Sequence, residues 1–154
     1  MTRIFLSTLL LFPAVLSAQM HFDKEKSKVK KELDHFISRN KSISPLLTET
    51  DSTLVLQTEE KPGQFIRIIY GFDRVSAKCN LQQTVTDCDA CYQEQLNKLM
   101  QQKSFQWKKL NENQYASRYE DHLLLELRSE ENDFTFTLFR TDWSRDFYDL
   151  LIKE

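Results

Sequence analysis

The chain has 154 residues, with 21 Lys+Arg against 23 Asp+Glu, 40% hydrophobic residues and 29% charged residues. This composition is typical of one ordinary globular domain and excludes the collagen-like, disordered and disulfide-dense classes. Only 2 glycines are present, which excludes a Gly-rich phosphate-binding loop, and a net charge of −2 gives no reason to expect nucleic acid as a partner.

Residues 1–18 have the features of a secretory signal peptide. Arg3 is the only charge in this segment, an apolar run extends over 4–12, and small residues follow it. Cleavage after Ser17 or Ala18 fits the pattern, and we favour Ala18. The run is shorter than the ~20 apolar residues that span a bilayer, and no cysteine near its end could carry a lipid anchor. We therefore expect an exported domain at 19–154, secreted or periplasmic, without stable insertion into a membrane.

The first half of this domain predicts a helix followed by three strands. Phe22, Val29, Leu33 and Phe36 share one helical face. The loop after this helix holds an Asn-Lys-Ser triplet that would accept a glycan at Asn40 if the protein passes through an endoplasmic reticulum.

Three strands are expected after this loop. Residues 53–58 and 64–70 are rich in strand-forming side chains, and the turn residues 61–63 between them indicate a hairpin. Strict alternation over 75–86 indicates a third strand with one buried face. The side chains expected on that buried face are Val75, Ala77, Cys79, Leu81, Gln83 and Val85.

The second half predicts a helix, four short strands and a final helix. Thr86 or Asp87 would cap the first helix, which ends near Lys103. The four strands are expected around 105–108, 115–119, 123–128 and 134–139, each with period-two alternation. Thr141 or Asp142 would cap the last helix. The residues expected on the buried sides of the two helices are Cys88, Tyr92, Leu96, Leu99 and Met100 in the first, and Trp143, Phe147, Leu150 and Leu151 in the last.

The predicted fold is therefore α+β, with the element order α-βββ-α-ββββ-α. About seven short strands, in groups of three and four, would form an antiparallel sheet on which three helices pack, because short connections join neighbouring antiparallel strands.

The three cysteines, Cys79, Cys88 and Cys91, are the disulfide candidates, and export makes one bridge the expected state. A straight strand over 79–86 spans more than 20 Å, which leaves only a Cys88–Cys91 bridge or free thiols. A bridge to Cys79 requires 79–87 to loop back. We favour Cys79 bonded to one of the others, because stapling that loop would stabilise a small exported domain by ~2–3 kcal/mol.

The spacing of Cys88 and Cys91 also matches the C-x-x-C pair of thioredoxin-like redox enzymes at a helix start. Asp87 and Asp89 flank the pair and would raise the pKa of its thiols. No proline follows the motif to supply the cis-proline of that architecture. Catalytic redox chemistry is thus the competing hypothesis, and a purely structural envelope component is a further one.

Nothing else in the sequence indicates catalysis, a metal site or a cofactor, so we expect a non-enzyme. Leu124 and Phe139 lie on the face opposite the apolar set of their own strands. Unless the last helix covers them, they form a patch for docking. The leading hypothesis is a small exported binding protein whose partner is an unknown protein or small ligand.

Overall fold

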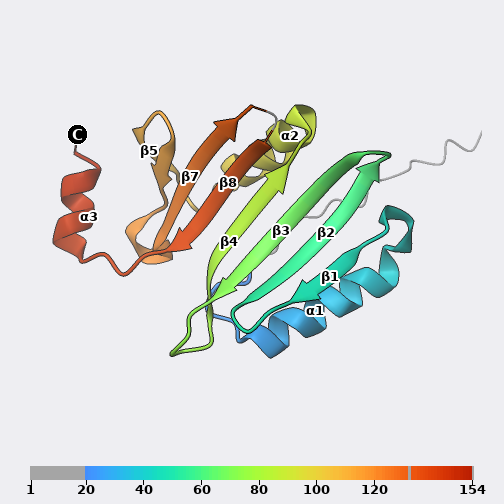
Figure 1. Cartoon of the computed structure of the whole chain (residues 1–154). Helices are drawn as coiled ribbons and strands as arrows, with labels where there is room; N and C mark the ends of the chain where they lie inside the picture. The colour runs from blue at the N-terminus through green and yellow to red at the C-terminus, as the bar shows by residue number, and fades with distance from the viewer. Residues whose placement is uncertain (1–19, 132, 154) are drawn as a thin grey trace, which may run out of the picture.

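The computed structural model describes residues 20–131 and 133–153. Figure 1 shows three helices and one wide, twisted sheet in this part of the chain. The helices are α1 (Lys26–Arg39), α2 (Asp89–Met100) and α3 (Arg145–Leu151). The strands are β1 (Leu46–Glu49), β2 (Thr53–Lys61), β3 (Gln64–Phe72), β4 (Cys79–Thr86), β5 (Lys108–Asn111), β6 (Gln114–Ala116), β7 (Leu123–Glu130) and β8 (Asp133–Arg140).

All eight strands form a single antiparallel sheet in the order β1-β2-β3-β4-β8-β7-β6-β5. Each half of the sheet is a four-stranded meander preceded by a helix, and the two meanders meet where β4 pairs with β8. The predicted α+β class and three helices are confirmed, with eight strands rather than seven. The additional strand, β1, escaped prediction because it has only 4 residues, follows Pro45 and buries none of its side chains fully.

Helices α1 and α2 pack on the same face of the sheet, one beneath each half, and build the core. Val29 and Leu33 of α1 join the buried side chains of β2 and β3, including Leu56 and Ile68. In the other half, Tyr92 and Leu99 of α2 pack with buried side chains of β7 and β8. One row of paired residues runs across five strands and joins the two clusters, which therefore lie on one side of the sheet. The row consists of Leu56, Ile68, Thr84, Phe136 and Leu127, each paired with the next.

The predicted buried face of β4 is wrong. The core side of this strand carries Gln82, Thr84 and Thr86, all at most 3% exposed, whereas Leu81 and Val85 face the other way. The reason is a bulge: Gly71 pairs with Leu81 but Phe72 pairs with Cys79, which leaves Asn80 as an extra residue. The bulge shifts the alternation by one position, so Cys79 and Gln82 both point into the core. Val75, also predicted to be buried, is 96% exposed in the loop before β4.

The predicted ends of several elements also differ from the structure. Cys88, rather than Thr86 or Asp87, caps α2. The strand expected at 105–108 begins only at Lys108. The cap of α3 is Ser144, whose hydroxyl accepts from Phe147 N.

The predicted buried face of α3 is likewise wrong. Tyr148 is buried, while Phe147 is 48% and Leu150 is 65% exposed. Tyr148 takes the buried position because its hydroxyl donates to the carbonyl of Ser117, which holds the helix at the edge of the sheet.

The predicted signal peptide at 1–18 lies outside the described residues. Within 20–131 and 133–153, no helix is both long enough and apolar enough to cross a bilayer.

Candidate functional site

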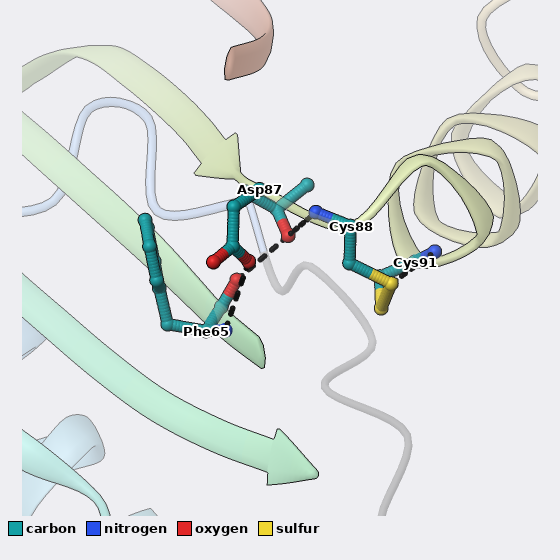
Figure 2. The surroundings of a disulfide bond; sticks show 5 residues. Phe65, Asp87, Cys88 and Cys91 are labelled. Atoms are coloured by element: carbon teal, nitrogen blue, oxygen red, sulfur yellow. Dashed lines mark hydrogen bonds between the residues drawn. A yellow bond between two sulfur atoms is a disulfide. The ribbon is translucent and has the colours of Figure 1, made fainter. Parts of the chain in front are cut away.

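The disulfide Cys88–Cys91 closes the first turn of α2, directly after β4 (Figure 2). The two Cα atoms lie 5.2 Å apart, and Cys88 Sγ also accepts a hydrogen bond from Cys91 N at 3.1 Å. Cys88 N donates to the hydroxyl of Thr86 at 3.2 Å. The bridge therefore sits on the N-cap of the helix, where it joins the cap to the first turn.

The residues just before the bridge are tied to β3. Thr86 Oγ1 donates to the carbonyl of Phe65 at 2.6 Å, and Asp87 Oδ1 accepts from Phe65 N at 3.2 Å. Figure 2 shows Asp87 pointing toward Phe65 at the start of β3. These two bonds use both backbone polar groups of Phe65, so the strand end, the cap and the bridge form one fixed unit.

Cys79 is the free cysteine and lies at the opposite end of β4. Our preference for a bridge to Cys79 is therefore wrong, and the straight-strand alternative is the one found. Cys79 is 1% exposed, and burial raises the pKa of its thiol to about 11. A thiol in this state is a small core side chain rather than a nucleophile.

The bridge is poorly placed for thiol–disulfide exchange. Cys88 is 7% and Cys91 is 9% exposed, so an attacking thiolate would have little access to either sulfur. Among the described residues no peptide bond is cis. The arrangement favours a structural staple between β4 and α2.

A second polar cluster lies near the start of the described chain, around His21. This side chain is 2% exposed, and its Nδ1 lies 3.0 Å from Glu32 Oε2. Lys24 Nζ donates to both carboxylate oxygens of Glu32, at 2.9 and 2.8 Å, and the imidazole packs edge-on against Tyr70. Burial lowers the pKa of His21, with a contribution from Lys24, while the bond from Lys24 lowers the pKa of Glu32. The cluster fixes residues 21–24 against α1 and β3.

The face of the sheet opposite α1 and α2 brings together the two residues predicted to form a patch. Leu124 of β7 and Phe139 of β8 pair directly across the strands, and Phe139 also pairs with Leu81 of β4. We call this surface the open face. Its apolar members on β2, β3, β4, β7 and β8 are Val55, Phe65, Ile69, Leu81, Val85, Leu124 and Phe139, all of them partly exposed.

Gly71 completes the row formed by Leu81, Phe139 and Leu124. A Cβ atom at Gly71 would lie 3.1 Å from Leu81 Cβ, so the side chain of Leu81 leans over the glycine. The absence of a side chain at Gly71 therefore keeps this row of the open face flat.

Two pairs of polar side chains on the open face bond to one another. Gln83 Nε2 donates to Thr137 Oγ1 at 3.1 Å, and Arg67 donates to Gln57 Oε1 at 3.3 Å. Such pairing leaves few polar groups that a covering molecule would have to desolvate without replacement.

Helix α3 lies at the margin of the sheet beyond β5, as Figure 1 shows at the left. Tyr148 anchors it to Ser117, and Arg145 adds an ion pair of 3.2 Å to Glu120. The helix is therefore fixed beside the β6 end of the open face, where Ala116 is fully buried.

A cleft of ≈ 510 Å³ lies elsewhere, near the start of α1 and the loop between β3 and β4. Its lining combines charged and apolar side chains, namely Lys26, Asp51, Ser52, Phe72, Asp73, Arg74 and Ala77. Asp73 is committed to the loop, because its carboxylate accepts from Val75 N and Ser76 N, which lowers its pKa. No local pattern in the sequence marks this cleft, since residues far apart in the chain form it.

Within the described part of the chain, no three His, Cys, Asp or Glu side chains gather in a way that could hold a metal ion. Comparison with known protein families, curated proteins and solved structures finds no match for this chain.

Proposed function

We propose that this protein is an exported, non-catalytic interaction protein that binds another polypeptide on its open face. The observation that supports this most is the orientation of β4. The strand directs the hydroxyl and amide groups of Thr84, Thr86 and Gln82 into the core and the aliphatic side chains of Leu81 and Val85 outward. Apolar side chains gathered on an accessible surface mark interaction sites in soluble proteins.

The breadth of the open face supports a polypeptide rather than a small molecule as the partner. Small ligands are bound in concave pockets that enclose most of their surface. The open face instead extends over β2, β3, β4, β8 and β7, and Leu81 fills the notch at Gly71.

Export is supported by the signal-like composition of residues 1–18 and by the Cys88–Cys91 bridge. Disulfides persist in oxidising compartments and are rare in the reducing cytosol. We therefore propose that the protein acts in a periplasm or outside the cell.

A photo-cross-linking amino acid at position 139 tests the docking surface. p-Benzoyl-phenylalanine keeps the ring of Phe139 and extends it outward by a benzoyl group, and the same replacement of Phe147 on α3 is the matched control, because both are aromatic side chains outside the core. We expect a discrete polypeptide adduct from position 139 in the source cells, lost when Leu124→Ser is added, and no such adduct from position 147. Failure of position 139 to form an adduct would refute the proposal.

Thiol–disulfide exchange through Cys88 and Cys91 is the competing function, supported by the position of the bridge at the start of α2. Equilibration of the protein with glutathione buffers separates the two. A buried structural bridge has a potential below about −300 mV and stays oxidised there. A bridge that opens and closes reversibly near the potential of the glutathione pool would instead support the redox function.

A further inference from the structure

We propose that the polypeptide bound on the open face is a second copy of this chain, so that two sheets pack face to face with their helices outside. This inference rests on the proposed function, because it names the partner of the same surface. Three features of the open face support it: the area, the placement of the charges and the paired polar groups.

The area of the open face is sufficient for a stable dimer. The five strands β2, β3, β4, β8 and β7 have 8 or 9 residues each. With strands ~4.8 Å apart and ~3.4 Å per residue, they cover about 24 by 27 Å, or roughly 650 Å² in flat projection. Two such faces in full overlap would bury about 1,300 Å², which reaches the range of ~1,200–2,000 Å² seen for stable protein–protein interfaces.

The charges of the open face are of both signs. By their pairing positions, Arg67 and Arg128 share this face with four acidic side chains, Glu59, Glu126, Glu130 and Asp133. Arg128 lies 3.9 Å from Glu126, and the guanidinium of Arg67 lies 5.3 Å from the ring centroid of Phe65. The face therefore has a small acidic excess, which comes from the Glu130–Asp133 pair. That pair lies at the opposite end of β7 and β8 from Leu124 and Phe139, so two copies can join their apolar rows without bringing the acidic pairs together.

The remaining polar groups also suit a second copy. The Gln83–Thr137 and Arg67–Gln57 hydrogen bonds satisfy these side chains within one chain. These side chains therefore need no hydrogen-bond partners from a second copy. The apolar side chains of Leu81, Leu124 and Phe139 can pack against the same residues of that copy. Sheets that stack in this way keep their strands within about 30° of one another and interdigitate their inner side chains.

Sedimentation equilibrium of the purified protein tests the proposal directly. We expect twice the mass of one chain in the micromolar range for the wild type, and the mass of one chain for the double variant Leu124→Asp/Phe139→Asp. Two controls should remain dimeric: Val75→Asp, at a loop position that is 96% exposed, and Phe147→Ser/Leu150→Ser on the exposed side of α3. A wild type that stays single at hundreds of micromolar, or a dimer lost in the α3 control, overturns the proposal.

Thiol labelling provides a measurement that does not depend on the folding of the double variant. Cys79 is buried and Cys88 is bonded to Cys91, so an introduced Val55→Cys supplies the accessible thiol. We expect its reaction with a maleimide to slow at least tenfold between dilute and concentrated protein, whereas Val75→Cys reacts at one rate throughout. A dimer in which position 55 reacts freely would use a different surface and overturns the inference.

The two proposals fail in different ways. If the protein is single and position 139 cross-links to a different polypeptide, the second copy is refuted and the proposed function stands. If the protein is single and position 139 forms no adduct, both are refuted.

Discussion

The two faces of the sheet differ in the side chains that β4 directs onto them. The face beneath α1 and α2 is closed and contains the core, yet at its centre it carries Gln82, Thr84 and Thr86. The open face has no such cover from these helices, yet at the same strand it presents Leu81 and Val85. A domain that needed only to fold would gain by exchanging these side chains, and this difference is the main support for our proposal that the open face binds a partner.

The largest expected effect is a difference in stability loss between two phenylalanines of β8, one on each face of the sheet. Phe136 is 2% exposed in the core, whereas Phe139 lies on the open face. We expect Phe136→Ala to lower the free energy of unfolding by about 3–5 kcal/mol, because truncation of a buried phenylalanine loses its packing and leaves a cavity. Phe139→Ala should cost under about 1 kcal/mol in dilute solution. Urea denaturation checks both, and equal losses would show that the open face is covered.

The next test concerns the staple between β4 and α2. Cys88→Ser/Cys91→Ser should lower the free energy of unfolding by about 2 kcal/mol, the value for a short closed loop, with added loss from the altered helix cap. Reduction of the wild type should give a similar loss in urea denaturation. Cys79→Ser is the matched control, since its effect should be the same with and without reductant. A wild type that is insensitive to reduction would contradict the structural role of the bridge.

Local patterns in the sequence predicted much of the fold. Period-two alternation in 123–128 and 134–139 identified β7 and β8, and the turn at 61–63 identified the hairpin of β2 and β3. Those signals are local, because alternation and turn chemistry are properties of neighbouring residues. The class of the fold followed from them.

The orientation of β4 could not be predicted in the same way. Its alternation was read correctly, but the bulge at Asn80 depends on the pairing of Gly71 and Phe72 in another strand. A shift of one residue turns every side chain to the other face, so a correct period gave a wrong face. The same holds for α3, where the anchor of Tyr148 on Ser117, distant in sequence, decides which side is buried. Leu124 and Phe139 were found because their strands continue without interruption.

A smaller effect is expected from replacing the buried amide of Gln82, on the face of the sheet that α1 and α2 cover. Gln82 is 1% exposed, lies in register between Tyr70 and Leu138, and neither atom of its amide has a hydrogen-bond partner among the described residues. Gln82→Met keeps the volume and removes the unpaired groups. We expect the free energy of unfolding to rise by about 1 kcal/mol, which urea denaturation would detect. A loss of stability instead would mean that the amide is satisfied in the folded protein.

The smallest expected effect is the pH dependence of stability that comes from the cluster of His21, Lys24 and Glu32. Burial lowers the pKa of His21 below its ordinary value of 6.5, so the unfolded chain binds the proton more readily than the folded one. Stability should therefore fall as the pH drops below about 6.5. The lowered pKa of Glu32 extends this fall below its ordinary value of 4.5, because protonation of Glu32 ends its interaction with Lys24.

The substitution His21→Gln should remove the upper part of this pH dependence and leave the lower part, which belongs to Glu32. His35→Gln, at an exposed position of the same helix region, is the matched control and should keep the wild-type profile. Midpoints of urea denaturation between about pH 2.5 and pH 8 measure both profiles, since the part that belongs to Glu32 lies below pH 4.5. Because Tyr70 and Cys79 pack in the same neighbourhood and carry no charge in this range, an upper slope that survives His21→Gln would have to come from a group outside the cluster.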